Sequence, residues 1–241
     1  MKVIITENYD EMSQKAFEII KEVVVNNKNA VLGLATGSTP IGTYDLMVKD
    51  YEQNATSYAG VSSVNLDEYV GLTADHNQSY AYFMCKHLFD RVDIDKANTR
   101  LPNGVAPDLN VECDEYNAML ATKRQDVQIL GIGSNGHIGF NEPGTEKDSV
   151  THVVDLTENT IKDNSRLFDD VNDVPRQALS MGISNILNAK KIIVMASGEN
   201  KAWAINAMIN GAVTPEVPAS FLQEHPDVTV IVDKLAGKLL K

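Results

Sequence analysis

Short apolar runs alternate along the chain with stretches whose apolar residues recur at helical spacing, and this alternation most constrains the fold. The first helical stretch carries Met12, Ala16, Ile19, Ile20 and Val23 on one face. We interpret as strands the runs 3–5, 30–35, 61–66, 127–132, 150–156, 191–196 and 228–232, and as further helices 44–54, 79–90, 108–124 and 199–210. Strand and helix repeated this often predict an α/β fold, with a single open, mostly parallel sheet and helices on both faces. We expect one domain over residues 1–241.

The composition limits the class of ligand. Of 241 residues, 43% are apolar and 22% are charged, which suffices for a core and argues against disorder. The formal net charge is -12. Binding to a nucleic-acid backbone needs clustered Lys and Arg, so the acidic balance argues against nucleic acid as a partner. A small phosphorylated ligand stays open, because it needs only a few cations and backbone N–H groups.

The expected compartment follows from the cysteines and from the apolar segments. Cys85 and Cys113 have no metal-ligand spacing, and two cysteines are too few for a disulfide framework. The first ten residues lack the basic start and long apolar run of a signal peptide. No apolar segment approaches membrane-spanning length. We therefore expect a soluble, cytoplasmic protein with no membrane partner.

In a parallel sheet, ligands bind beyond the carboxyl ends of the strands, and four unusual clusters follow predicted strands. The first is Thr36, Gly37, Ser38, Thr39 and Pro40, directly after the run 30–35. A glycine, two hydroxyls and a proline suited to a first helical turn make an anion site at a helix N-terminus. An ordinary tight turn with a helix cap explains the same residues about equally well.

The second cluster is Asp67 and Glu68, directly after the run 61–66. Two adjacent carboxylates at a strand end offer a candidate general base. Taken alone, the pair is better explained as a helix cap beside a solvated acid.

The third cluster extends over residues 131–143, after the run 127–132, and carries Asn135, His137, Asn141 and Glu142 among glycines. Imidazole suits proton transfer near neutral pH, and glycines alone would suffice for a turn, so we take His137 as functional. The other four histidines lack such a setting, and we assign them to the surface or core. A metal site is disfavoured, because no second histidine or cysteine stands at ligand spacing.

The same glycines also match the dinucleotide-binding pattern Gly-x-Gly-x-x-Gly, with Asp155 about twenty residues on. That motif must open a helix that holds the pyrophosphate. Gly139, Pro143 and Gly144 interrupt any helix here. We therefore regard the match as fortuitous.

The fourth cluster places Lys201 in the first turn of the predicted helix 199–210, where an ammonium group can meet a phosphate. A solvated surface lysine is the commoner fate of such a residue. Arg166 lies in a polar stretch between elements and is a second candidate phosphate ligand, since guanidinium binds phosphate through two parallel hydrogen bonds.

Together the four clusters resemble the glucosamine-6-phosphate deaminase family. The matching stretches are LATGSTP at 34–40, NLDEYVGL at 65–72, GIGSNGHIGFNEPG at 131–144, NSRLF at 164–168 and SGENKA at 197–202. Each is weak alone, but they come in the family's order and spacing across nearly the whole chain. The resemblance implies a Rossmann-like fold of the deaminase and 6-phosphogluconolactonase type. It also implies amino-sugar catabolism, with glucosamine 6-phosphate and water converted to fructose 6-phosphate and ammonia.

The resemblance also implies roles for the site residues. Asp67 would move a proton between C2 and C1 of the opened sugar, and His137 would open the pyranose ring. Glu142 and Asn135 would hold that imidazole. Residues of the loop Thr36–Thr39, with Arg166 and Lys201, would bind the 6-phosphate. No metal or organic cofactor is implied, because one carboxylate and one imidazole can carry out the proton transfers.

Two departures from the family matter. Many members have Asp where this chain has Asn135. We expect the amide oxygen to accept the imidazole N–H, and so to orient His137 without favouring its protonated form. The larger members are hexamers activated by N-acetylglucosamine 6-phosphate. Here the stretch 145–162 offers only Lys147, His152 and Lys162 as cations. We therefore expect a monomer or small homo-oligomer without that activation.

Two other functions fit the same fold. A 6-phosphogluconolactonase would use His137 to activate water on an ester, and Asp67 would then have no evident proton to move. A sugar-phosphate-sensing module of a regulator would bind the ligand without turnover. The set of Asp67, His137 and Glu142 favours catalysis over that second alternative.

Overall fold

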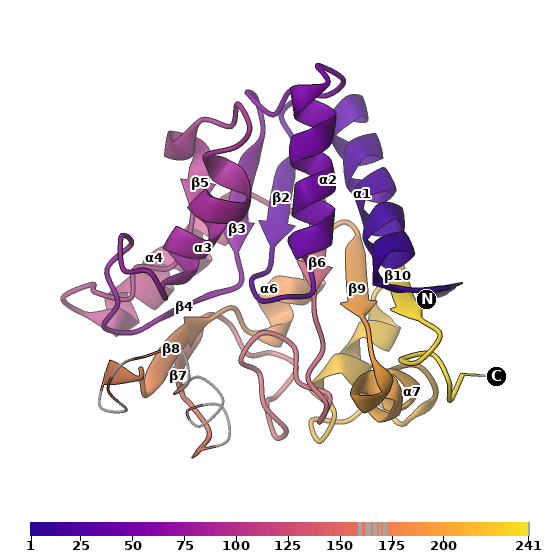
Figure 1. Ribbon diagram of the computed structural model, residues 1–241. Helices are drawn as coiled ribbons and strands as arrows, with labels where there is room; N and C mark the ends of the chain where they lie inside the picture. Colours follow the sequence, from indigo (N-terminus) through magenta and orange to yellow (C-terminus); the bar gives the residue numbers. More distant parts are fainter. Residues whose placement is uncertain (159–160, 162–164, 166–167, 169, 171–172, 241) are drawn as a thin grey trace.

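A seven-stranded, wholly parallel sheet forms the centre of the molecule (Figure 1). The computed structural model describes the chain except residues 159–160, 162–164, 166–167, 169, 171–172 and 241. The strand order is β1 (Lys2–Thr6), β10 (Val228–Asp233), β9 (Ile192–Ala196), β6 (Val127–Leu130), β2 (Val31–Leu34), β3 (Ser62–Asn65) and β5 (Thr99–Arg100). Central strands β6, β9 and β10 are buried along their whole length, as expected when helices cover both faces.

The helices lie on both sides of this sheet. They are α1 (Tyr9–Asn26), α2 (Ile41–Glu52), α3 (Tyr80–Met84), α4 (Leu109–Thr122), α6 (Ile183–Leu187) and α7 (Ala202–Asn210). In Figure 1, α1 and α2 lie in front of the sheet and α4 lies behind it. Side chains cap α1 and α4: Asn8 accepts the Glu11 N–H at the start of α1, and Asp108 caps α4 as predicted.

A second, antiparallel sheet lies beyond the carboxyl ends of the parallel strands, below their arrowheads in Figure 1. It contains β4 (Asp67–Tyr69), β8 (Gln177–Ser180) and β7 (His152–Asp155). The predicted main sheet is confirmed, but the strand expected at 150–156 belongs to this small sheet. The seventh parallel strand is instead the two-residue β5, which periodicity does not reveal.

Some predicted elements differ in detail. The helix expected at 79–90 is a short α-helix, α3, followed by a π-helical turn, η1 (Cys85–Phe89). The stretch 199–210 begins as the 3₁₀ turn η4 (Glu199–Lys201) before α7. Two further 3₁₀ turns, η2 (Lys96–Asn98) and η5 (Pro218–Glu224), were not predicted. None of the helices in the described part of the chain is long and apolar enough to cross a membrane.

The strand order places a topological switch point between β2 and β6. From β2 the chain proceeds outward through β3 to β5, whereas β6, β9 and β10 lead toward the opposite edge. The loops that leave β2 and β6 therefore diverge and open a crevice at their carboxyl ends. The residues that enter this crevice are 35–40 and 131–137, which are the first and third clusters of the sequence.

Candidate active site

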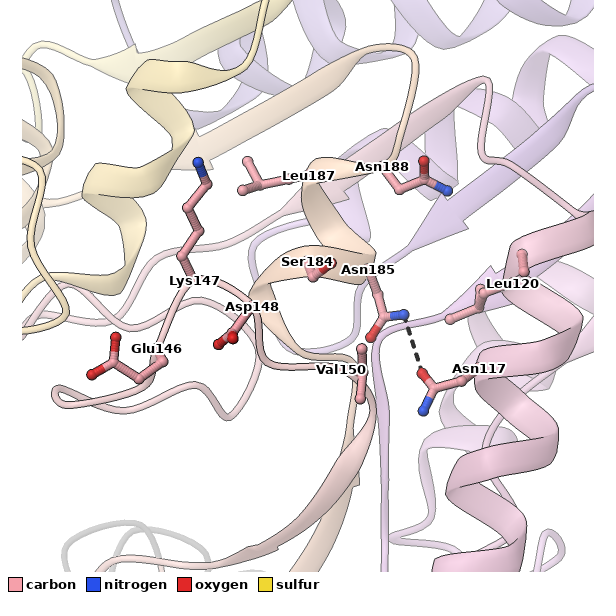
Figure 2. A pocket seen from close by; sticks show the side chains of 11 residues that line it. Asn117, Leu120, Glu146, Lys147, Asp148, Val150, Ser184, Asn185, Leu187 and Asn188 are labelled. Carbon is pink, nitrogen blue, oxygen red and sulfur yellow. Dashed lines mark hydrogen bonds between the residues drawn. The ribbon is translucent and has the colours of Figure 1, made fainter.

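A pocket of about 480 Å³ lies at this switch point and brings the four clusters together. Its lining includes the loop Thr36–Thr39, Asp67, His137 and Lys201. Asn135 and Glu142 do not line it but lie directly against His137. Arg166 lies outside the described residues. A larger pocket of about 770 Å³ lies between α4, the loop 146–150 and α6, and contains none of the four clusters (Figure 2).

Asp67 is the first residue of β4 and is only 7% exposed. Leu66, Tyr80 and Phe140 line the same pocket and help to keep water away from it. Burial, reinforced by the neighbouring charge of Glu68, raises the pKa of Asp67 from 3.8 to about 8. A carboxyl group with a pKa near the working pH is suited to take and return a proton.

Glu68 has a different task, although it is the next residue. It accepts the backbone N–H groups of Tyr69, Tyr80 and Ala81 at 2.8–2.9 Å. Two of these donors belong to the start of α3, so Glu68 supports that helix N-terminus. Burial raises the pKa of Glu68, and the three backbone hydrogen bonds oppose the rise. Glu68 therefore serves the start of α3, as the capping interpretation expected, but neither carboxylate is solvated, and the role of Asp67 as a base stays a prediction.

His137 is supported by Glu142 and Asn135. Its Nδ1 atom lies 3.2 Å from Oε1 of Glu142, which is ion-pair distance, although the ring is not aligned for a good hydrogen bond. The pKa of Glu142 is lowered, first by this contact with His137. A proton held on Nδ1 beside the carboxylate leaves Nε2 as the ring's acceptor.

Asn135 does not accept the imidazole N–H, contrary to our expectation. Its Oδ1 accepts the backbone N–H of His137 at 3.2 Å, and its Nδ2 donates to Oε2 of Glu142 at 2.7 Å. The short turn from 135 to 137 brings the amide oxygen to the main chain rather than to the ring. Asn135 therefore acts on the imidazole through Glu142.

Glycine is required beside the histidine. A Cβ built on Gly133 would lie 2.3–2.5 Å from three ring atoms of His137. No real Cβ approaches another atom so closely. The Gly133 N–H also donates to the carbonyl oxygen of His137 at 2.9 Å. Gly133 thus makes room for the imidazole, in addition to shaping the turn.

The opposite side of the pocket carries the residues that the sequence suggested as an anion site. Gly37 has a φ of 87°, so the chain turns sharply into α2. We expected Pro40 in the first turn of the helix, but it stands one position earlier, at the N-cap of α2. Its side chain cannot cap that helix N-terminus. Lys201 faces this pocket, and burial lowers its pKa. Lys201 makes no ion pair with any residue in the part of the chain that the structure describes.

Tyr80 is a site residue that the sequence did not reveal. It lines the pocket, and burial first, together with the neighbouring Tyr69 and Asp67, raises the pKa of its hydroxyl well above the usual value. Its ring lies 4.6 Å from that of Tyr69 and 6.4 Å from that of Phe140, measured between centroids. At position 80 an aromatic residue fits a helix face packed on a core, so periodicity gives no signal of the role.

The described part of the chain contains no group of three or more His, Cys, Asp or Glu side chains placed to hold a metal ion. The pocket itself brings three kinds of chemical group together. They are a buried carboxyl with a raised pKa, an imidazole backed by a carboxylate, and an anion site on the far side.

Comparisons with known proteins agree on the family. Residues 6–231 match the family described as glucosamine-6-phosphate isomerases/6-phosphogluconolactonase. A glucosamine-6-phosphate deaminase of Clostridium perfringens is 50% identical over 242 residues, covering 100% of both chains. The same enzyme from Lactobacillus johnsonii is 52% identical over 240 residues, covering 100% of this chain and 98% of the relative.

Solved structures are similar over the whole chain. A monomeric glucosamine-6-phosphate deaminase superposes with a TM-score of 0.95 at 43% identity, covering 99% of this chain and 100% of the other. A 6-phosphogluconolactonase from Trypanosoma cruzi superposes with a TM-score of 0.80 at 20% identity, covering 100% and 97%. The second likeness establishes a shared fold alone.

Proposed function

The chain belongs to the family of glucosamine-6-phosphate isomerases and 6-phosphogluconolactonases, and we propose that within it the chain is a glucosamine-6-phosphate deaminase. The observation that carries the proposal is the buried Asp67, whose pKa is about 8, in one pocket with His137 and an anion site. An enolisation needs such a base close to a carbon acid in a site that excludes water.

The proposed reaction begins with ring opening. His137 takes the proton of the C1 hydroxyl and returns a proton to the ring oxygen as the C1–O bond to that oxygen breaks. Nδ1 keeps its proton beside Glu142, so Nε2 is the ring nitrogen that receives and releases the transferred proton. The open chain has an aldehyde at C1 and an amine at C2, and the aldehyde makes the C2 proton acidic.

Asp67 then acts as the base. It removes the proton from C2 while the C1 carbonyl oxygen gains a proton, which gives an enolamine. It then returns its proton to C1 while the nitrogen loses one, so that C1 becomes a CH2OH group and C2 an imine, which completes the aldose–ketose isomerisation. Water adds to the imine carbon, the C–N bond breaks, and ammonia and fructose 6-phosphate leave. Every step is a proton transfer or an addition of water, so the balance needs no oxidant, reductant or further reactant.

We propose that the phosphate is held by the loop Thr36–Thr39 together with Lys201. The uncapped start of α2 and the half-buried lysine support this assignment. Arg166, outside the described residues, remains our proposed second cation. A phosphate bound on the far side of the pocket from Asp67 supplies binding energy that holds C1 and C2 against that carboxyl group.

We further propose an enzyme without activation by N-acetylglucosamine 6-phosphate. Of the cations considered for such an effector, Lys147 is paired with Glu224, and His152 bonds through Nδ1 to the carbonyl of Val150 at 2.8 Å. Lys162 lies outside the described residues. In the large pocket of Figure 2, Lys147 extends away from the asparagines, and Glu146 and Asp148 flank it. That lining disfavours a sugar phosphate.

The remaining assignments concern assembly and compartment. The similar structure at 43% identity is described as monomeric, which supports a monomer or small homo-oligomer. The two cysteines, Cys85 and Cys113, are both free thiols, which suits the reducing cytoplasm.

The test is a comparison of two substrates. The purified protein is given glucosamine 6-phosphate and, separately, 6-phosphogluconolactone, with ammonia, fructose 6-phosphate and 6-phosphogluconate all measured. We expect ammonia and fructose 6-phosphate in equal amounts and no acceleration of lactone hydrolysis. Lactone hydrolysis without ammonia release would establish the alternative function of the fold. Binding of glucosamine 6-phosphate with neither reaction would establish a sensing module.

A further inference from the structure

We propose that Asp233 is a positioning residue for the phosphate site, because it holds the turn that presents Lys201 to the pocket. The inference rests on the proposed function, since it assigns the phosphate of the substrate to Lys201. Asp233 does not line the pocket itself, so it acts through other residues.

The carboxylate of Asp233 joins the ends of two neighbouring strands. Asp233 is the last residue of β10, and the preceding residue Val232 pairs with Ala196, the last residue of β9. Its Oδ2 accepts the hydroxyl of Ser197 at 2.6 Å, and the Gly198 N–H reaches its two oxygens at 3.0 and 3.2 Å. Asp233 thereby fixes the first two residues that follow β9.

The rest of the turn depends on that anchor. Gly198 has φ 94° and ψ 152°, a conformation that is essentially open to glycine alone. Its carbonyl oxygen then accepts the N–H of Lys201 at 3.1 Å. A continuous chain of contacts therefore leads from Asp233 through Gly198 to Lys201, which lines the same pocket as the loop Thr36–Thr39.

Asp233 is also held firmly on its own side. The Ala236 N–H donates to its Oδ1 at 2.7 Å, and only 6% of the residue is exposed. Burial alone would raise the pKa of Asp233, but hydrogen bonds from Ala236, Ser197, Gly198 and Leu235 lower it on balance. The carboxylate is therefore ionised and fully engaged in these loops. The pKa of Lys201, by contrast, is lowered by burial alone, so Asp233 acts on it through geometry.

The test compares Asp233→Asn with wild type in the full chain. An amide presents one oxygen and two donors where the loops require an acceptor, so the turn should loosen. We expect KM for glucosamine 6-phosphate to rise roughly tenfold, with kcat within about twofold of wild type. Calorimetric titration with inorganic phosphate should show the same loss of affinity.

The matched control is Asp126→Asn. Asp126 also ties main-chain segments together, since it accepts the Val31 N–H at 2.8 Å and pairs with Lys190 at 2.7 Å, but it lies at the amino end of the sheet. We expect Asp126→Asn to lose as much stability as Asp233→Asn but to keep the KM of wild type. A rise of KM in both variants would mean that general destabilisation is responsible, and would overturn the proposal.

Two further readouts keep the outcome clear. Ser197→Ala removes only the hydroxyl that donates to Asp233, and it should raise KM by a smaller factor. If Asp233→Asn does not fold, unchanged KM and phosphate affinity in Ser197→Ala overturn the proposal.

If wild type releases no ammonia, the proposed function fails, and titration with inorganic phosphate still tests Asp233. Equal phosphate affinity in wild type and Asp233→Asn overturns the inference in either case.

Discussion

Replacing Asp67 with asparagine should make the protein more stable while it removes the proposed base. The carboxyl group is buried, and its pKa is raised from 3.8 to about 8 in the folded state. Folded Asp67 therefore keeps its proton up to about pH 8, whereas the unfolded chain releases it near pH 4. The stability that protonated Asp67 allows is fully present below about pH 4 and is lost as the pH rises through 8.

The size of the effect follows from the same values. Each tenfold change in the proton dissociation constant corresponds to about 1.4 kcal/mol. Above pH 8 the buried carboxyl group of Asp67 therefore lowers the free energy of unfolding by on the order of 5 kcal/mol. Asparagine avoids this cost, but its buried amide donors lack partners, which costs about 1–3 kcal/mol. We expect Asp67→Asn to raise the free energy of unfolding by about 2–4 kcal/mol at pH 8.5.

Urea unfolding at pH 5 and at pH 8.5 measures the effect. The difference in free energy of unfolding between Asp67→Asn and wild type should increase by about 3–4 kcal/mol from pH 5 to pH 8.5. Asp233→Asn is the contrasting control, because hydrogen bonds lower the pKa of Asp233. That carboxylate stabilises the fold above its unfolded pKa, and the contribution is lost as the pH falls. A gain for Asp67→Asn that does not change with pH would refute the reasoning.

Three further predictions concern the site. Gly133→Ala forces the imidazole of His137 aside, so kcat should fall by roughly a hundredfold with an unchanged circular dichroism spectrum, and wild-type turnover would contradict the packing argument. Asn135→Asp places a second carboxylate beside Oε2 of Glu142, which should raise the pKa of Glu142 and move the pH–rate profile to higher pH; an identical profile would count against this contact. Lys201→Ala should raise KM roughly tenfold to a hundredfold and abolish inhibition by inorganic phosphate, while retained inhibition would place the anion elsewhere.

Much of the fold was predictable because its central strands are continuous apolar runs. The strands β6, β9 and β10, which lie within the predicted runs 127–132, 191–196 and 228–232 or extend one residue beyond them, are buried along their whole length. The small sheet was not predictable. Its strands are three or four residues long, and β4 pairs with β8 more than a hundred residues away. Such pairing depends on tertiary contacts, which periodicity does not record.

The site was predictable at the level of clusters and less so at the level of contacts. Parallel strands place their carboxyl ends at one edge, so residues after β2, β3, β6 and β9 had to meet. The division of work between Asp67 and Glu68 depends on which carboxylate meets the start of α3. The partner of Asn135 depends on the direction of one side chain. Asp233 could not be found from the sequence, because a polar residue at the end of a strand has no distinguishing pattern.

The measurement that tests the account most directly is ammonia release by Asp67→Asn at saturating glucosamine 6-phosphate. Wild type should release ammonia and fructose 6-phosphate in equal amounts. The variant, shown to be folded by circular dichroism, should lose about a hundredfold to ten-thousandfold in kcat, the usual contribution of a positioned base. Turnover of the variant within tenfold of wild type would contradict the central claim that Asp67 moves the proton between C2 and C1.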